Sequence, residues 1–258
     1  MAYKSFSNLL TVVVASCLFL IVFPYFHGVA FSNSSDTLPY EDPGVRRVIE
    51  RIGPKAESRI KPHFQRAGVP YPPKQICFIV VKDVLELELW AEHNGAWKHI
   101  HTYDILFTSG WSGPKLREGD RQVPEGIYRI TALNPASRFY LSMKINYPND
   151  YDLRQARRDR RSNLGGNIHI HGKDKSHGCI AIGDVAIEEL FVLVAKTGLD
   201  DVKVIITPSD MRKFGPVRNM PSRPSWLPDL YETIRRELMK FVNNNGFWQT
   251  SPENPQPH

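Results

Sequence analysis

The sequence predicts a β-rich α+β fold, with strands in the middle of the chain and helical segments on either side of them. Short apolar runs separated by turn residues recur between positions 76 and 145, a pattern typical of an antiparallel meander. Helical spacing of apolar residues is found before this region, in 43–67, and after it, in 184–196 and 228–243. At 258 residues the chain is long enough for one sizeable domain with extensions.

These patterns divide the chain into four expected segments. Residues 1–30 are a signal peptide or membrane anchor, and 31–75 are a linker followed by an N-terminal helical region. Residues 76–208 are the β-rich domain, and 209–258 hold a C-terminal helix and a disordered tail. Within the N-terminal helical region, Gly53-Pro54 predicts a break between two short helices.

The N-terminal segment has the pattern of an export signal. Lys4 precedes an apolar run at 9–26, and the small residues at 28–30 suit cleavage before Phe31. An uncleaved anchor is the main alternative, because the 18 residues of this run are almost enough to span a membrane. A lipoprotein site at Cys17 is a weaker alternative, since strongly apolar residues continue after it.

The chain is basic, with a formal net charge of +6. This charge suits an anionic polymer such as a cell wall, but nucleic acid would satisfy it equally. Five arginines between 154 and 161 fit a solvated loop or short helix as well as a polyanion-binding surface. Because the sequence has no zinc-finger spacing and no Gly-Lys-Ser phosphate loop, charge alone does not identify the partner.

The stretch 167–180 concentrates the residues that carry chemistry. The alternation of isoleucine and histidine at 168–171 predicts a half-buried strand, with His169 and His171 on the same face. Gly172 begins a short turn, after which Ser176-His177-Gly178 leads into Cys179. A thiol and an imidazole at neighbouring strand ends are what nucleophilic cysteine chemistry requires.

Each residue of this stretch has a candidate role. A free thiol has a pKa of about 8.5 and needs a partner to form thiolate, so His171 is the candidate base for Cys179. The N–H groups of Gly178 and Cys179 are candidate donors to an oxyanion, and Ser176 and His177 are expected to orient the site. The alternative is a core cysteine beside exposed strand histidines.

The cysteines and histidines have two other possible roles, metal binding and disulfide formation. Zinc is the rival chemistry, because four side chains are possible ligands: His169, His171, His177 and Cys179. The stretch lacks the carboxylate and the spacing of common zinc hydrolases, so we predict neither metal nor cofactor. Cys77 lies in an apolar run and is expected to be a small buried hydrophobe; a disulfide to Cys179 would block the candidate nucleophile.

A set of motifs in a specific order along 43–208 resembles the L,D-transpeptidase (YkuD-like) catalytic domain. The motifs are Tyr71-Pro72-Pro73, Leu87-Glu88-Leu89-Trp90, Ser112-Gly113-Pro114-Lys115, Glu118-Gly119-Asp120-Arg121-Gln122, Pro124-Glu125-Gly126-Ile127-Tyr128, Tyr147-Pro148-Asn149 with Tyr151-Asp152, and finally His171-Gly172 with Ser176-His177-Gly178-Cys179. The short spacing between His171 and Cys179 is similar to that of the YafK-like branch.

The resemblance implies a catalytic domain at 76–208, a mixed β-sandwich or barrel with flanking helices. It implies a periplasmic cysteine enzyme that acts on the peptide stems of peptidoglycan through an acyl-enzyme. Cys179 would attack the carbonyl at the L-centre of the third stem residue, and His171 would carry the proton. Ser176, His177 and Gly178 would shape the site. The candidate substrate contacts, for which a structural role is equally open, are Lys115, Arg121, Tyr147 and His169.

Several alternatives stay open beside this prediction. An amine acceptor gives transpeptidation, whereas water gives hydrolysis, including release of a wall-linked lipoprotein. A wall-binding module without catalysis is a further alternative, against which the intact His171 and Cys179 argue. Nucleic acid is not an expected partner, and a membrane is expected only through an uncleaved N-terminal segment. Ile180-Ala181 follows Cys179 where many family members have Arg, so no substrate contact through that Arg is expected.

Overall fold

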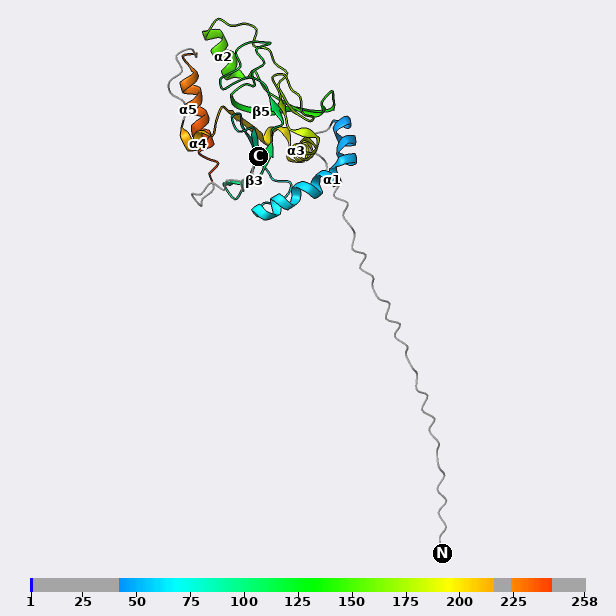
Figure 1. Ribbon diagram of the computed structural model, residues 1–258. Coiled ribbons are helices and arrows are strands. Elements are labelled where there is room, and N and C mark those ends of the chain that lie inside the picture. The colour runs from blue at the N-terminus through cyan, green and yellow to red at the C-terminus, as the bar shows by residue number, and fades with distance from the viewer. Residues whose placement is uncertain (2–41, 216–223, 243–258) are drawn as a thin grey trace, which may run out of the picture. The chain divides into compact units, whose positions relative to one another are not determined.

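A nine-stranded mixed sheet organises the computed structural model, which describes residue 1, residues 42–215 and residues 224–242 (Figure 1). The order across the sheet is β3-β2-β1-β9-β5-β6-β7-β8-β4. The strands are β1 (Ile76–Val81), β2 (Glu86–His93), β3 (Ala96–Asp104), β4 (Phe107–Thr108), β5 (Gly126–Ser137), β6 (Tyr140–Ile145), β7 (His169–His171), β8 (Ile180–Ala181) and β9 (Val202–Thr207). Two pairs, β1 with β9 and β7 with β8, are parallel, and the others are antiparallel.

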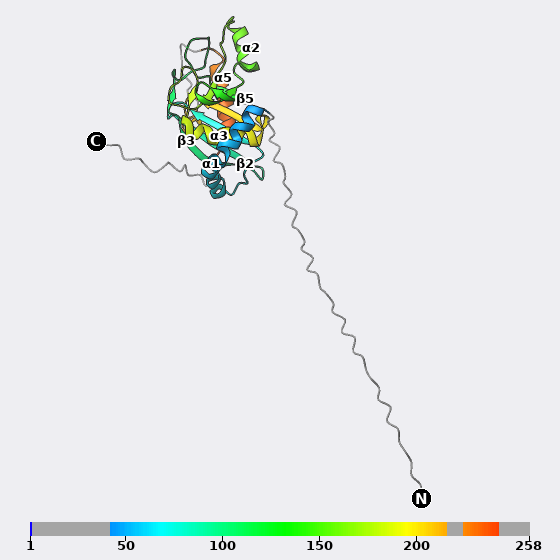
Figure 2. The same ribbon diagram turned by 90° about the vertical axis from the view of Figure 1, so that its right-hand side faces the viewer.

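Helices flank the sheet, so the expected α+β fold is confirmed. They are α1 (Pro43–Ala67), α2 (Asp150–Arg158), α3 (Gly183–Thr197), the 3₁₀ turn η1 (Leu199–Asp201), α4 (Met211–Phe214) and α5 (Leu227–Leu238). All of them lie in the compact unit Thr37–His258. Figure 2 shows α1 beside α3, with which it is in contact.

The central strand β1 explains how both faces of the sheet are covered. All six of its residues are buried. Ile76, Phe78 and Val80 belong to a hydrophobic cluster that includes residues of α1 and α3, whereas Cys77 and Ile79 belong to a second cluster with residues of α5. Because successive strand residues point to opposite faces, a continuous apolar strand serves two helical layers. Cys77 is thus the buried hydrophobe that the sequence predicted.

Helix α1 is one helix of 25 residues, so the prediction of a break at Gly53-Pro54 was wrong. Asp42 caps its N-terminus by accepting the Val45 N–H at 2.9 Å, and Gly68 ends it in the left-handed conformation with φ of 67°. The interior prolines at 54 and 62 each remove a backbone donor. The helix continues because an apolar stripe along its length is buried in the core, and tertiary packing outweighs local propensity.

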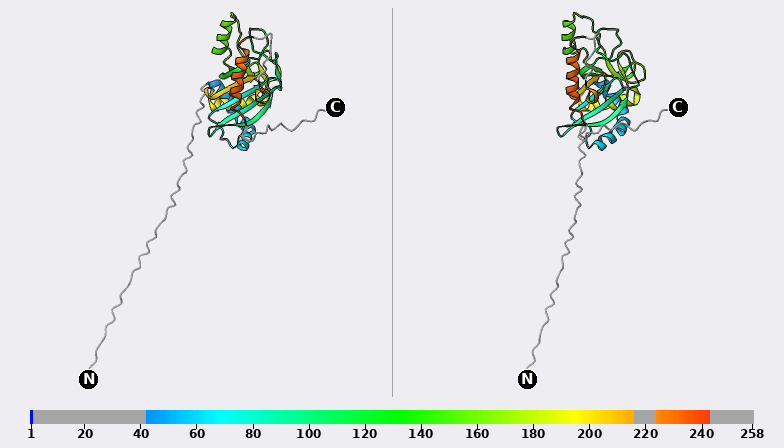
Figure 3. Two further views of the ribbon diagram at one scale, coloured as in Figure 1. Left: turned by 90° about the vertical axis from the view of Figure 1, so that its left-hand side faces the viewer. Right: turned by 60° about the vertical axis from the view of Figure 1, so that its left-hand side comes forward.

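Other helical predictions agree with the structure. The arginine-rich segment forms α2, whose N-cap Asn149 and Asp152 make a reciprocal capping box. The C-terminal helix α5 adjoins α2 (Figure 3), where the Trp226 indole donates to Asp159 at 2.8 Å. The predicted export signal at 1–30, the linker and the C-terminal tail lie outside the described residues. Of the helices that are described, none combines the length and the apolar character that crossing a membrane requires.

Candidate active site

Strands β7 and β8 bring the predicted histidines and cysteine to one face of the sheet. In this parallel pair Ile170 lies opposite Ile180, and both are fully buried on the core side. Cys179 immediately precedes β8 and is therefore level with His169. Because residues opposite one another share a face, His169, His171 and Cys179 all project from the other side of the sheet.

The His171 ring is held in one tautomer. Its Nδ1 lies 2.7 Å from the carbonyl oxygen of Gly172, which can only accept, so Nδ1 carries the proton and donates. The other ring nitrogen, Nε2, is buried and has no hydrogen-bond partner among the described residues. Burial lowers the pKa of His171, with the Gly172 carbonyl acting in the opposite direction. A neutral imidazole with an unshared lone pair on Nε2 suits a general base.

The residues around His171 hold its imidazole ring in one position. Phe139, from the β5–β6 hairpin, stacks on the imidazole with ring centroids 4.4 Å apart. Gly172 fits where no larger residue would, since an added Cβ would lie 2.7 Å from an Asp184 carboxylate oxygen and 2.9 Å from the Phe139 carbonyl oxygen. Asp184 in turn accepts the Lys173 N–H at 2.8 Å, which fixes the turn that follows β7.

The Cys179 thiol is free and partly buried. Its Sγ lies 3.6 Å from the carbonyl oxygen of Asn167, to which it donates. Burial raises the pKa of Cys179, and three groups oppose this: the His169 backbone, the Ser176 hydroxyl and the Lys115 ammonium. A raised pKa means that the resting thiol is protonated at neutral pH. Nucleophilic attack then requires a base, and His171 is the base on the same face.

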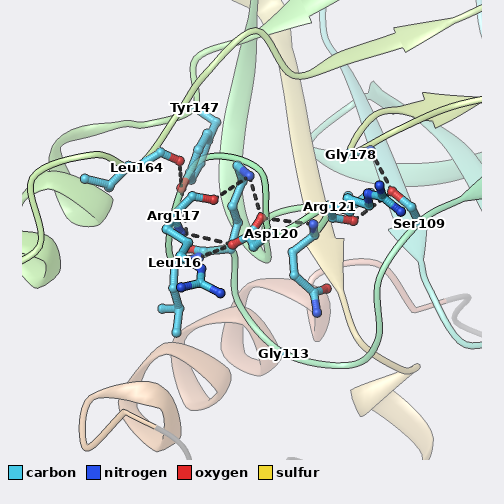
Figure 4. Close-up of polar contacts among 12 residues, drawn as sticks. Ser109, Gly113, Leu116, Arg117, Asp120, Arg121, Tyr147, Leu164 and Gly178 are labelled. Atoms are coloured by element: carbon cyan, nitrogen blue, oxygen red, sulfur yellow. Dashed lines mark hydrogen bonds and ion pairs between the residues drawn. The ribbon is translucent and has the colours of Figure 1, made fainter.

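The two candidate oxyanion donors are occupied by serine hydroxyls in this conformation. The Cys179 N–H donates to Ser176 Oγ at 3.0 Å, and the Gly178 N–H donates to Ser109 Oγ at 2.6 Å. Ser109 donates its own proton to the Arg121 carbonyl at 2.7 Å (Figure 4). Gly178 has φ of 88°, a conformation that favours glycine. An oxyanion would have to replace the hydroxyls at these N–H groups.

The Lys115 side chain binds residues of the loop to which it belongs. It is buried, and its ammonium binds the Asp120 carboxylate at 2.6 Å and the Arg117 carbonyl at 3.0 Å (Figure 4). Asp120 also accepts the backbone N–H groups of Leu116, Arg117 and Gln122 at 2.8–3.0 Å, which closes the turn. The structure therefore gives Lys115 a structural position, from which its charge still acts on Cys179.

The remaining candidate residues differ in accessibility. Tyr147 is buried, and its hydroxyl lies 3.4 Å from the Lys115 carbonyl and 3.3 Å from that of Leu164, so it braces the loop (Figure 4). Arg121 is exposed at the edge of the site. His177 is exposed and makes no hydrogen bond with the described residues, so it does not orient the site in this conformation.

His169 lies beside His171 without the same anchoring. Its Nδ1 is buried and lacks a hydrogen-bond partner in the described parts of the chain. Burial lowers the pKa of His169, and the nearby charges of Lys144 and His171 lower it further. The described residues contain no group of three or more His, Cys, Asp or Glu side chains arranged to hold a metal ion.

The loop over the site is anchored by a buried charge cluster that the sequence did not reveal. Glu125 accepts the Gly113 N–H at 2.7 Å and the Tyr231 hydroxyl of α5 at 2.7 Å. The Lys82 ammonium lies within hydrogen-bonding distance of four acceptors, namely the carbonyls of Trp111 (2.8 Å), Gly113 (3.3 Å) and Val123 (3.2 Å) and the Glu125 carboxylate (2.9 Å). Both ends of the 111–123 segment are therefore fixed at one point.

Ser109, Phe139, Lys82 and Glu125 are the site-building residues that sequence reasoning missed. Ser109 touches a residue 69 positions away, and Lys82 one that is 43 positions away. No local spacing encodes such contacts. Glu125 does fall within a motif of the family resemblance, Pro124-Glu125-Gly126-Ile127-Tyr128, and that position was the one available signal.

Comparison with known proteins adds independent findings. Residues 92–206 match the family model of the YkuD L,D-transpeptidase catalytic domain. Proteins of Escherichia coli K12 and O157:H7, provisionally assigned as L,D-transpeptidase YafK, are each 33% identical over 137 residues. The match covers 51% of this chain and 53% of theirs, so the chain spans about half the length of the curated relatives it matches.

Three solved structures from different bacteria show a partial likeness to this chain. The helical cell shape determining protein Pgp2 of Campylobacter jejuni is 24% identical, with a TM-score of 0.44 over 53% of this chain and 48% of that one. Bd1075 of Bdellovibrio bacteriovorus is 20% identical, with a TM-score of 0.40 over 67% and 57%. L,D-transpeptidase 1 of Mycobacterium tuberculosis is 10% identical, with a TM-score of 0.31 over 52% and 62%.

The matched range includes His171 at the end of β7 and Cys179 just before β8. It also includes the loop that carries Ser109 and Lys115. Residues 92–206 are therefore similar in sequence to the catalytic domain of the YkuD L,D-transpeptidase family.

Proposed function

We propose that this protein is a cysteine-dependent L,D-transpeptidase that acts on the peptide stems of peptidoglycan through an acyl-enzyme. One observation carries the proposal. His171 Nδ1 is committed to the Gly172 carbonyl, which leaves the buried Nε2 as the acceptor for a proton on the face that also bears Cys179. The family of the domain supports a peptidoglycan substrate.

The first half-reaction forms a thioester. His171 Nε2 takes the proton of the Cys179 thiol, and the thiolate attacks the carbonyl carbon at the L-centre of the third stem residue. The carbonyl oxygen becomes an oxyanion, for which the Gly178 and Cys179 N–H groups are the nearest donors; losing one such donor typically costs about 3 kcal/mol. The C–N bond then breaks, and the departing amine takes the proton from the imidazolium.

The second half-reaction transfers the acyl group. An acceptor amine attacks the thioester, His171 removes its proton, and the thiol is regenerated as the C–S bond breaks. Water in place of the amine gives hydrolysis of the same bond class. A wall-linked lipoprotein is a further substrate of this chemistry, because its linkage to a stem is also an amide.

The test uses defined tetrapeptide muropeptides incubated with the protein and analysed by mass spectrometry. Cross-linked dimers or exchange of the terminal D-amino acid are expected, and both should disappear in Cys179→Ala. Cys77→Ala is the matched control, because Cys77 is fully buried in β1, which β9, β5 and β6 separate from β7, and the substitution should leave the products unchanged. Shortened stems alone would identify a hydrolase. No product here, nor from a wall-linked lipoprotein, would favour a wall-binding module.

We also propose that the protein acts in the periplasm. The support is the export pattern at 1–30, with its apolar run and its small residues before Phe31. Cell fractionation with N-terminal sequencing of the mature protein tests this. An N-terminus at Phe31 in the periplasmic fraction is expected, an intact N-terminus in the membrane fraction would indicate an anchor, and recovery in the cytoplasm would contradict the proposal.

A further inference from the structure

Trp111 differs from the other tryptophans that the structure describes. Its side chain is 81% exposed. Trp90 and Trp226 are buried and donate to carboxylates, and Trp97 packs against Phe241 with ring centroids 4.8 Å apart. The Trp111 ring makes no ring contact and no hydrogen bond with the described residues. An exposed tryptophan ring without a role in the core presents a flat apolar face on which a ligand can stack.

The backbone that carries this exposed indole is firmly held. The Trp111 N–H donates to Gln122 Oε1 at 3.0 Å, and its carbonyl accepts from the Lys82 ammonium at 2.8 Å. Two residues on, the Gly113 N–H is bound by Glu125 at 2.7 Å, and both Lys82 and Glu125 are buried. A side chain presented to solvent on a fixed backbone loses little conformational freedom when it binds, as a recognition residue should.

Trp111 also stands close to the nucleophile. Ser109, two residues earlier, binds the Gly178 N–H, and Gly178 is adjacent to Cys179 (Figure 4). Successive α-carbons are about 3.8 Å apart, so Ser109 and Trp111 are separated by at most about 7.6 Å. A three-residue stem spans at most about 10 Å when extended, so the sugar that bears the stem lies within a similar distance of the attacked carbonyl.

We propose that Trp111 is a sugar-binding platform for the glycan strand whose stem occupies the active site. The proposal rests on the function proposed above and names a second part of the same substrate. The C–H face of a sugar ring stacks on the electron-rich face of an indole, while its hydroxyl and amide groups bind polar side chains. Polar neighbours are present at the platform, because Ser112 and Arg121 are exposed and Gln122 is half-buried.

The composition of the platform favours a sugar over an apolar protein partner. Protein interfaces gain most of their affinity from a central cluster of apolar anchors surrounded by further buried contacts. Here the residues on either side of Trp111 are Gly110 and Ser112, and the loop segment hydrogen-bonded to this stretch contributes Arg121 and Gln122. A single aromatic ring among polar groups matches one sugar ring.

The test compares two substrates that share one tetrapeptide, with and without the attached disaccharide. In Trp111→Ala, kcat/KM for the disaccharide tetrapeptide should fall about tenfold relative to kcat/KM for the free tetrapeptide, equivalent to about 1.4 kcal/mol. The change should appear in KM, and Trp111→Tyr should recover most of it. Val84→Ala is the matched control, because Val84 is 56% exposed in the β1–β2 connection and belongs to no site.

The outcomes separate the two proposals. An equal loss on both substrates would assign Trp111 to the stem or the loop and overturn the glycan platform, as would no loss on either. If the protein turns over neither substrate, the proposed function fails. The platform is then judged by calorimetric titration of the disaccharide tetrapeptide into Cys179→Ala with and without Trp111→Ala. Binding weakened about tenfold by the second substitution supports the platform, and equal or absent binding overturns it.

Discussion

Two polar clusters in this protein differ in how completely their atoms have hydrogen-bond partners. In the cluster of Lys82, Glu125 and Tyr231, both carboxylate oxygens and the ammonium have partners at 2.7–3.3 Å. In the cluster of His169, His171 and Cys179, one nitrogen of each ring has none among the described residues. The first cluster is complete and holds the loop, whereas the second is left open for a proton and a substrate.

A buried polar atom without a hydrogen-bond partner does not by itself identify an active site. The buried hydroxyls of Tyr71, Tyr151 and Thr197 also lack hydrogen bonds in the described part of the chain. What distinguishes His171 is that the other nitrogen of its ring is fixed and that a free thiol shares its face. The difference between the clusters therefore lies in which atom is open and what stands beside it.

The largest expected effect comes from removing the base. His171→Ala should lower kcat by about 10²–10⁴-fold, the usual contribution of a general base, and should also lower the melting temperature, because the ring is buried and stacks on Phe139. Initial rates on tetrapeptide muropeptides measure kcat, and a thermal melt measures the melting temperature. His93→Ala is the control, since His93 lies at the end of β2 and its ring hydrogen-bonds only to Asn94 among the described residues. Near-normal kcat in His171→Ala would remove His171 from the reaction.

A substitution in the cluster of Lys82, Glu125 and Tyr231 should lower the free energy of unfolding. Glu125→Gln leaves the buried Lys82 ammonium without its carboxylate, and breaking a buried pair costs about 3–5 kcal/mol. Urea unfolding measures the loss. Lys61→Ala breaks the half-exposed pair with Glu57 and should cost at most about 1 kcal/mol. Equal effects of the two substitutions would show that the buried cluster is not the anchor of the loop.

Ser109→Ala tests whether the Gly178 N–H can be made more available to a substrate. The substitution removes the hydroxyl that occupies the Gly178 N–H, so this donor becomes available to an oxyanion. One neutral hydrogen bond is worth about 0.5–1.5 kcal/mol, so kcat/KM should rise about two- to tenfold. Steady-state rates on the same muropeptides measure this change. A fall in kcat/KM would mean that Ser109 supports the reaction instead of competing with the oxyanion for the Gly178 N–H.

The smallest effect is a shift in pH dependence. Burial lowers the pKa of His171, so the base stays neutral to a lower pH than an ordinary histidine. The acid limb of the kcat/KM profile is therefore expected below pH 6.5, the ordinary histidine value. Burial raises the pKa of Cys179, so the rate at which iodoacetamide alkylates the resting thiol should still be rising with pH at pH 9.0, the ordinary thiol value, instead of levelling off there. An acid limb above 6.5 would contradict a buried, neutral His171.

The parts of the site that were predictable are those encoded locally. Alternating isoleucine and histidine indicated β7, which the structure contains. The placement of His169 and His171 on one face followed from the strand period alone. Local pattern was sufficient here because β7 and the start of β8 are separated by a short turn.

The rest of the fold depends on contacts between distant residues. Gly53-Pro54 predicts a break by local rules, yet burial of the apolar stripe holds α1 together. Tyr231 lies outside the family match at 92–206, but its hydroxyl completes the Glu125 cluster. Likewise β1 precedes that range and forms the centre of the core. Such contributions follow from packing and carry no sequence motif.

Mass spectrometry can show whether Cys179 carries the acyl group during the reaction. The protein is mixed with a tetrapeptide muropeptide, quenched with acid and digested to locate any adduct. We expect a thioester on the peptide containing Cys179, which hydroxylamine removes and which is absent from Cys179→Ala. Continued turnover by Cys179→Ala, or an adduct on another residue, would contradict it.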